Sequence, residues 1–209
     1  MGQYYKTIIK PEHEDETGIK AVHTLGYKLL EHNYFNNRHT DMVTQLMYKR
    51  PCQVAEMGDY ADDYLLNPEC QTETFKKKSN ERKLDLAVMY HLYRFDDNID
   101  YVESSEQMCY NTDYKPQWDY NKLWFVNHDL KTGINLGKSM ERNKNKDGWI
   151  LYTPNLLCAV GNGLGGGDYY DNLPNFEDVG AWAGDIVEIT DSLPLDYTED
   201  TETYFKEEY

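Results

Sequence analysis

The chain has 209 residues, a length typical of one globular domain, and 40% of its residues are hydrophobic, which is enough to form a core. Its formal net charge is -16 at pH 7. So acidic a chain is poorly suited to binding duplex DNA or an anionic membrane, because those contacts need clustered lysine and arginine, and a partner with a basic surface suits it better.

The N-terminal residues predict a β-hairpin. Residues 3–10 alternate in polarity and are rich in tyrosine, threonine and isoleucine, a composition typical of strands. Residues 18–24 form a second short run of this kind, and a polar loop that opens with Pro11 separates the two. Two strand-like runs joined by such a loop favour an antiparallel pair.

An amphipathic helix and a further strand follow the hairpin. Apolar residues after Asn37 recur with the 3.6-residue period of a helix. Thr40 is a suitable N-cap, so we predict a helix from there to about Lys49, with Pro51 as the residue that ends it. Residues 53–61 then have the pattern of a strand.

The middle of the chain mixes one strongly periodic segment with irregular sequence. Apolar residues at helical spacing predict an amphipathic helix over residues 84–95. Residues 96–121 are rich in Asp, Asn, Ser and Tyr and show little period, which predicts an irregular excursion. Four short apolar runs after Lys122, separated by Gly, Asn, Lys and Pro, are strand candidates: residues 123–127, 149–153, 156–160 and 185–189.

Together these elements predict an α+β fold. Strands come before and after the central helices without regular alternation, which favours a mixed or antiparallel sheet with two or three helices packed on it. We expect a single domain at residues 1–190, with an irregular insertion near residues 64–122. Residues 191–209 form an acidic, aromatic C-terminal tail. This tail is either solvated or docks on a basic partner through its aromatic rings.

The glycine-rich segment GNGLGGGDYYDN at residues 161–172 is the most unusual stretch. Gly161, Gly163 and Gly166 match the GxGxxG spacing of a phosphate-binding loop. No helix is predicted after them, and Asp168 would repel a pyrophosphate, so a dinucleotide-binding fold is disfavoured. Five glycines within seven residues still require unusual backbone angles or close approach by a ligand. The segment is therefore a structural turn or a binding loop.

The histidines match no recognised metal or catalytic spacing. His32 beside Glu31 and His128 beside Asp129 are candidates for a general base that a carboxylate orients. The pairing of His128 with Asp129 is geometrically poor, because adjacent residues on a strand point to opposite faces. Since no nucleophile motif occurs, we assign no catalytic residue, and a binding role is favoured over an enzymatic one.

The cysteines and the apolar runs bear on cofactors and on the compartment. Cys52, Cys70, Cys109 and Cys158 form no CxxC pair, so we expect no structural zinc, and no other metal or cofactor. The chain has no pattern of a secretion signal and no apolar run long enough to span a bilayer. These features predict a cytoplasmic protein with reduced thiols and no membrane partner.

Several sequence blocks resemble one protein family. These are MGQYYK at residues 1–6, LGYKLLEHNYFNN at 25–37, AEMGDYADD at 55–63, WFVNHDLKTG at 124–133, TPNLLCAVGNGLGGGDY at 153–169 and VGAWAGDIVEI at 179–189. They resemble a family encoded by bacteriophages, prophages and gut or soil bacteria, which begins MGQYY and carries a late GNGxGGGDY block. The resemblance implies this genomic setting and no particular activity. Residues 64–122 fall outside it, and Met57 and Tyr152 depart from the family's pattern.

The resemblance, the net charge and the abundant tyrosines predict a phage-encoded accessory protein that binds and inhibits a host defence component. An acidic surface can occupy a basic nucleic-acid channel by replacing phosphates. The expected partner is a host protein with a basic surface, for example a CRISPR nuclease, in the cytoplasm of the host cell. One alternative is a nucleotide-binding or nucleotide-degrading protein that uses the Gly161–Gly167 loop, and another is a structural or dimerising domain. The residues expected to contact a ligand or partner are Gly161, Asn162, Gly163, Gly165, Gly166, Gly167, Asp168, Tyr169, His32, Asp59, Tyr60, Asn127 and His128.

Overall fold

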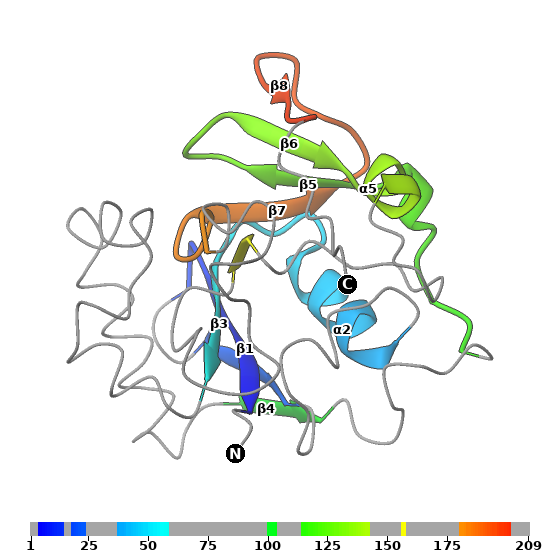
Figure 1. Cartoon of the computed structure of the whole chain (residues 1–209). Coiled ribbons are helices and arrows are strands. Elements are labelled where there is room, and N and C mark those ends of the chain that lie inside the picture. Colours follow the sequence, from blue (N-terminus) through cyan, green and yellow to red (C-terminus); the bar gives the residue numbers. More distant parts are fainter. Residues whose placement is uncertain are drawn as a thin grey trace, which may run out of the picture.

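The computed structural model describes residues 4–14, 18–23, 37–58, 100–103, 114–142, 156–157 and 180–201. These residues form an eight-stranded mixed sheet together with the helices α2 and α5 (Figure 1). The order of the strands across the sheet is β4-β2-β1-β3-β7-β5-β6-β8. The predicted α+β class and the mixed sheet are thus confirmed. The elements are β1 (Tyr5–Pro11), β2 (Lys20–His23), α2 (Arg38–Met47), β3 (Cys52–Gly58), β4 (Asp100–Glu103), the 3-10 helix η3 (Tyr120–Lys122), β5 (Trp124–Asn127), β6 (Thr132–Asn135), α5 (Leu136–Arg142), β7 (Ile186–Thr190) and β8 (Thr198–Glu199).

The N-terminal hairpin forms as predicted. Strands β1 and β2 pair antiparallel, with Thr7 opposite Val22, and β1 also pairs antiparallel with β3 along its whole length. All seven residues of β3 are buried. The short strand β4 pairs parallel with β2, so part of the segment predicted to be irregular, residues 96–121, is a strand. Its four residues join the sheet through backbone pairing with a distant strand, which local composition does not reveal.

Helix α2 begins three residues earlier than predicted. Asn37, not Thr40, is the N-cap, because the Asn37 side chain accepts a hydrogen bond from the Thr40 backbone N–H at 2.9 Å. The helix also ends at Met47, four residues before Pro51. Tyr48 is extended, Lys49 has a positive φ of 54°, and the Lys49 N–H binds the carbonyl of Ile189 at 2.8 Å. A contact with β7 therefore ends the helix, and the proline does not.

The main core lies between α2 and one face of the sheet. Val43 and Met47 of α2 are buried in a cluster with apolar residues of β1, β3, β5 and β7. Trp182 belongs to this cluster and packs against Phe125 at a tilted angle of 43°, with ring centroids 4.9 Å apart. Its backbone N–H binds the carbonyl of Leu156 at 2.8 Å. Residues 156–157 form a 3-10 turn, so the start of the strand predicted at residues 156–160 is wrong.

Strands β5 and β7 match the predicted runs within one residue, whereas β6 and α5 were not predicted. Strand β6 is four residues long and contains Gly133, which weakens its strand signal. That glycine has a packing reason, because a Cβ atom there would lie 2.5 Å from the Leu193 side chain. Gly137 in α5 has a similar reason, since its Cβ would lie 2.8 Å from the Cα of Asn121.

Residues 191–201, here called the C-terminal strap, lie against the sheet. Strand β8 lies at the edge of the sheet and pairs parallel with β6, and the Asp200 N–H binds the carbonyl of Gly133 at 2.9 Å. This part of the predicted C-terminal tail therefore packs on the protein itself (Figure 1). The predicted helix at residues 84–95, the strand at 149–153 and residues 202–209 lie outside the described residues. No helix in the described ranges combines the length and the apolar character that a bilayer crossing requires.

Candidate functional site

Only Asn127 and His128 of the predicted contact residues belong to the part of the chain that the structure describes. The other eleven lie outside it: Gly161, Asn162, Gly163, Gly165, Gly166, Gly167, Asp168, Tyr169, His32, Asp59 and Tyr60. Leu156 and Trp182, which lie before and after the glycine-rich segment in the sequence, are joined by a hydrogen bond from the Trp182 N–H to the Leu156 carbonyl. The Gly184 N–H in turn binds the carbonyl of Val54 in β3 at 2.9 Å.

Asn127 has a structural role in the turn after β5. It is fully buried, and its side-chain N–H donates to the carboxylate of Asp185 at 2.8 Å. Its side-chain oxygen accepts from the backbone N–H groups of Asp129 and Leu130, each at 3.0 Å. These bonds hold the turn between β5 and β6 and leave the Asn127 side chain away from solvent.

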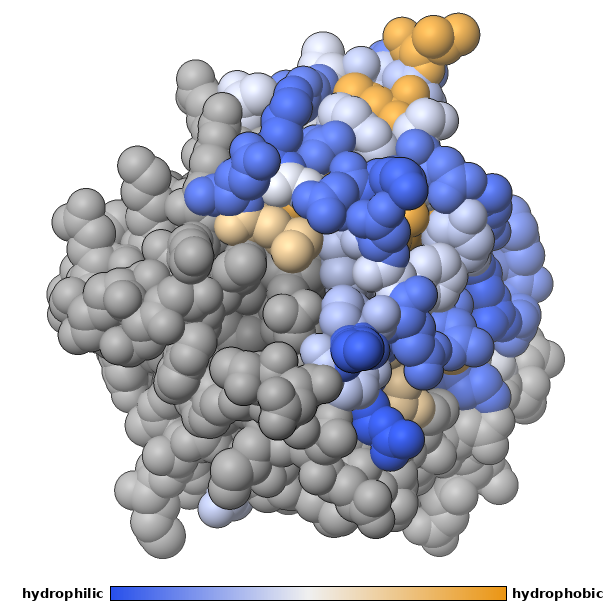
Figure 2. All heavy atoms as spheres, turned by 90° about the vertical axis from the view of Figure 1, so that its right-hand side faces the viewer, coloured by the Kyte–Doolittle hydropathy of each residue, from blue (hydrophilic) through white to orange (hydrophobic). Residues whose placement is uncertain are grey.

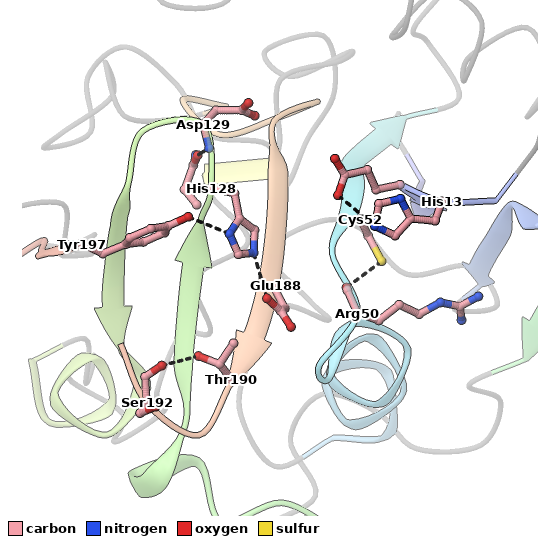
Figure 3. Close-up of polar contacts among 11 residues, drawn as sticks. His13, Arg50, Cys52, His128, Asp129, Glu188, Thr190, Ser192 and Tyr197 are labelled. Atoms are coloured by element: carbon pink, nitrogen blue, oxygen red, sulfur yellow. Dashed lines mark hydrogen bonds and ion pairs between the residues drawn. The ribbon is translucent and has the colours of Figure 1, made fainter. Parts of the chain in front are cut away.

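His128 points to the opposite face of the sheet, where it contacts β7 and the C-terminal strap (Figure 3). Its Nε2 lies 2.8 Å from the carboxylate of Glu188, and its Nδ1 lies 2.8 Å from the hydroxyl of Tyr197. Asp129 does not pair with the imidazole, because its carboxylate accepts from the Ile186 N–H at 2.7 Å. His128 and Asp129 lie in the turn after β5 and not on a strand as predicted, and the side-chain partners described for His128 are Glu188 and Tyr197. Asn127 and His128 do not converge on one cleft.

The hydrogen-bonded residues Glu188, His128 and Tyr197 resemble a proton relay. Because Tyr197 belongs to the C-terminal strap, we interpret these bonds as attaching the strap to the sheet. The Tyr197 hydroxyl occupies Nδ1, so both imidazole nitrogens are already engaged within the protein. Burial, followed by the nearby negative charge of Asp196, raises the pKa of Tyr197. This phenol therefore stays protonated and is a poor nucleophile.

Three lysines form ion pairs with acidic residues of the C-terminal strap. Lys49 binds Asp191 at 2.6 Å, Lys131 binds Asp196 at 2.9 Å, and Lys138 binds Glu199 at 2.7 Å. The Tyr48 hydroxyl also donates to Asp191 at 2.7 Å. Three of the four acidic residues of the strap therefore form ion pairs with lysines of the same chain, which lessens the negative charge that they offer to a partner.

A second polar cluster is almost completely buried between α2 and the sheet. Thr7 of β1, His39 of α2 and Glu56 of β3 are 0%, 3% and 1% exposed. The Thr7 hydroxyl donates to the Glu56 carboxylate at 2.6 Å and lies 2.9 Å from Nε2 of His39. Because a threonine hydroxyl has one proton, Nε2 of His39 must carry a proton and donate to Thr7. The three side chains therefore join α2, β1 and β3 through one hydrogen-bonded chain.

A third polar cluster surrounds Asp41 and adjoins a pocket. The buried Asp41 carboxylate accepts from the hydroxyls of Tyr114 and Tyr120, each at 2.6 Å, and from the Gln117 N–H at 2.8 Å. These bonds clip the segment at residues 114–120 onto the first turn of α2. Burial, followed by the hydrogen bond to Asp41, raises the pKa of Tyr114, so its phenol remains a hydrogen-bond donor.

The pocket beside this clip has a volume of about 300 Å³. Helix α2 contributes an arginine, an acid, a methionine and a glutamine at helical spacing, and the facing segment contributes a tyrosine and a glutamine. The described residues around it are Arg38, Asp41, Met42, Gln45, Tyr114 and Gln117. The side of the molecule seen in Figure 2 is mainly hydrophilic over its described residues. A pocket of this size with a cation, an aromatic ring and two amides suits a small polar ligand.

None of the six described residues around the pocket was among the predicted contact residues. The partners of Asp41 lie 73 to 79 residues along the chain from it, so no local motif joins them. Within the ranges described, no group of three or more His, Cys, Asp or Glu is arranged to hold a metal ion. Comparison with protein families, with curated proteins and with solved structures finds no match for this chain.

Proposed function

We propose that the protein binds a small nucleotide in the pocket between α2 and the segment at residues 114–120. The observation that carries this proposal is the combination of a hollow of about 300 Å³ with the hydrogen-bonded clip at Asp41. The clip holds the Tyr114 ring in place before any ligand arrives. Such preorganisation reduces the entropy that a ligand loses on binding.

The chemistry of the lining groups supports a nucleotide in particular. The guanidinium of Arg38 is suited to a phosphate, because its planar N–H groups match phosphate oxygens. The Tyr114 ring and the Met42 side chain offer surfaces on which a base can stack or pack, and base stacking on an aromatic ring stabilises by about 1–3 kcal/mol. The amide of Gln45 can donate to and accept from a base edge. Together these groups recognise an anionic end and a planar end of one ligand.

The proposed role is binding and sequestration rather than catalysis. The groups around the pocket include no paired base and nucleophile among the described residues. With the phage-like resemblance, this role suits a protein that removes a host signalling nucleotide from solution. The glycine-rich segment at residues 161–172 is the further part of the chain that we propose to contact such a ligand.

The proposal is tested by thermal unfolding and calorimetry with AMP, GMP, CMP and UMP. A ligand at 100 times its dissociation constant stabilises the protein by about 2.7 kcal/mol, so at least one of the four should raise the unfolding temperature. Arg38→Ala should weaken binding by about tenfold to a hundredfold, the effect of losing a charged hydrogen bond of about 1.5–3 kcal/mol. The matched control is Lys115→Ala, an exposed cation near the pocket but not around it. No stabilisation by any of the four, or equal weakening by both substitutions, would overturn the proposal.

Inhibition of a host nuclease by an acidic surface stays a prediction. The strap contributes little to it, because Asp191, Asp196 and Glu199 each bind a lysine of the protein itself. Its support lies in the net charge of -16 and in the phage-like resemblance. A direct test is binding to a purified CRISPR nuclease at low and high ionic strength, where affinity that is independent of salt would contradict electrostatic mimicry.

A further inference from the structure

We infer that Thr7, His39 and Glu56 are positioning residues for the proposed nucleotide pocket. This inference rests on the proposed function and concerns how the pocket is held open in its binding geometry. None of the three side chains is among the residues around the pocket. Their effect on a ligand would therefore be transmitted through α2.

The first step is the cost of burying these groups. A carboxyl group, an imidazole and a hydroxyl are each at most 3% exposed, and burial of such groups is unfavourable unless they are hydrogen-bonded. A hydrophobic trio in the same place would stabilise the fold at least as well. The polar trio is thus better explained by a requirement for one defined geometry than by stability.

The second step is the place at which the chain of hydrogen bonds meets α2. His39 lies in the first turn of the helix, between Arg38 and Asp41. Arg38 and Asp41 line the pocket, whereas His39 reaches Thr7 on the sheet. The same turn is therefore fixed from two sides, by the sheet through His39 and by the segment at residues 114–120 through Asp41.

The third step is that the Asn37 cap cannot replace this anchor. The cap bonds described at Asn37 run to the helix, through the N–H groups of Thr40 and Asp41. They define where the helix starts but not where its first turn lies relative to the sheet. The bond from His39 to Thr7, continued to Glu56, supplies this second restraint by tying the turn to two strands. Loss of the Thr7 hydroxyl should let the first turn shift and displace the Arg38 guanidinium.

The test compares Thr7→Val, Thr7→Ser and Ile9→Ala in the full chain. The probe is whichever of AMP, GMP, CMP and UMP binds the unmodified protein most tightly, measured by calorimetry. Thr7→Val removes the hydroxyl, Thr7→Ser keeps it, and Ile9→Ala removes buried apolar atoms two residues along the same strand. We expect Thr7→Val to weaken binding by about tenfold, which corresponds to about 1.4 kcal/mol. Thr7→Ser should restore most of the affinity, and Ile9→Ala should destabilise the protein without changing the affinity of the folded form.

A second readout does not depend on any ligand. Hydrogen exchange of the backbone amides at residues 39–42 should become faster in Thr7→Val than in Ile9→Ala when the two are compared at equal global stability. If Thr7→Val folds too poorly for calorimetry, His39→Phe provides the same comparison, because the ring keeps its approximate size but loses the nitrogen that donates to Thr7. The inference fails if Thr7→Val and Ile9→Ala have the same affinity and the same exchange at residues 39–42. Absence of mononucleotide binding by the unmodified protein would instead refute the proposed function, and the exchange data would still decide whether the anchor exists.

Discussion

Replacing Asp41 with alanine is expected to lower the free energy of unfolding by about 3–5 kcal/mol. The carboxylate accepts three hydrogen bonds, and bonds to charged groups contribute about 1.5–3 kcal/mol each. Tyr120 is only 2% exposed, so its hydroxyl would lose its principal acceptor in the interior. Tyr114 and Gln117 are less buried, so their donor groups can form hydrogen bonds with water instead. Losing their bonds to Asp41 therefore costs less free energy than losing the bond from Tyr120. The sum is a large share of the 5–15 kcal/mol that typically stabilises a domain.

Two further variants sharpen this prediction. Asp41→Asn keeps one oxygen acceptor and should cost about 1–2 kcal/mol, because only part of the set of bonds is lost. Asp119→Asn removes an acid whose ion pair with Lys122 is exposed, and such pairs contribute about 0–1 kcal/mol. Urea denaturation followed by circular dichroism measures all three. The reasoning would be refuted if Asp41→Ala and Asp119→Asn changed the stability by the same small amount.

Three other predictions concern the strap, the close-packed glycines and the buried thiol. Tyr197→Phe should make hydrogen exchange of residues 191–201 faster while leaving β1 unchanged, because the ring remains and only the hydroxyl bound to His128 is lost. In urea denaturation, Gly137→Ala should cost about 1–3 kcal/mol, and Gly133→Ala less, because the former meets backbone and the latter a movable side chain. Burial raises the pKa of Cys52 to about 12 in the folded protein, whereas an unfolded thiol has a pKa of about 8.5. Between these two values the unfolded chain ionises but the folded protein does not. The free energy of unfolding is therefore unaffected by this thiol below about pH 8.5 and falls as the pH rises toward 12. Cys52→Ala should therefore lose less stability than the unmodified protein between about pH 9 and 11, and an identical pH profile would contradict this.

Local sequence patterns predicted the elements whose apolar residues recur at regular spacing within a short stretch of sequence. Apolar residues occur at strand spacing in the hairpin and in β3, β5 and β7. This spacing is visible in the sequence because one or both faces of each strand are buried. The helix start was displaced because Asn37 and Thr40 are both good caps. The structure selects Asn37, whose oxygen accepts from the Thr40 N–H, so that Thr40 itself lies inside the first turn.

Contacts between distant residues escaped prediction. Strand β8 has two residues and pairs with β6 after the chain has turned at Pro194, which no short window of sequence can indicate. The same holds for the pocket, since Asp41 and its tyrosine partners lie on segments separated by more than 70 residues.

The net charge illustrates why composition alone could not identify the functional surface. A charge of -16 suggests an acidic exterior, but electrostatic mimicry requires carboxylates that are free to replace phosphates. In the C-terminal strap the carboxylates of Asp191, Asp196 and Glu199 instead bind lysines from three different places in the fold. A partner that displaced these lysines would have to break three ion pairs at exposed or half-exposed side chains, each of which contributes about 0–1 kcal/mol. For the proposed ligand, we therefore propose recognition by Arg38 and Tyr114, which line the pocket, and not by the acidic strap.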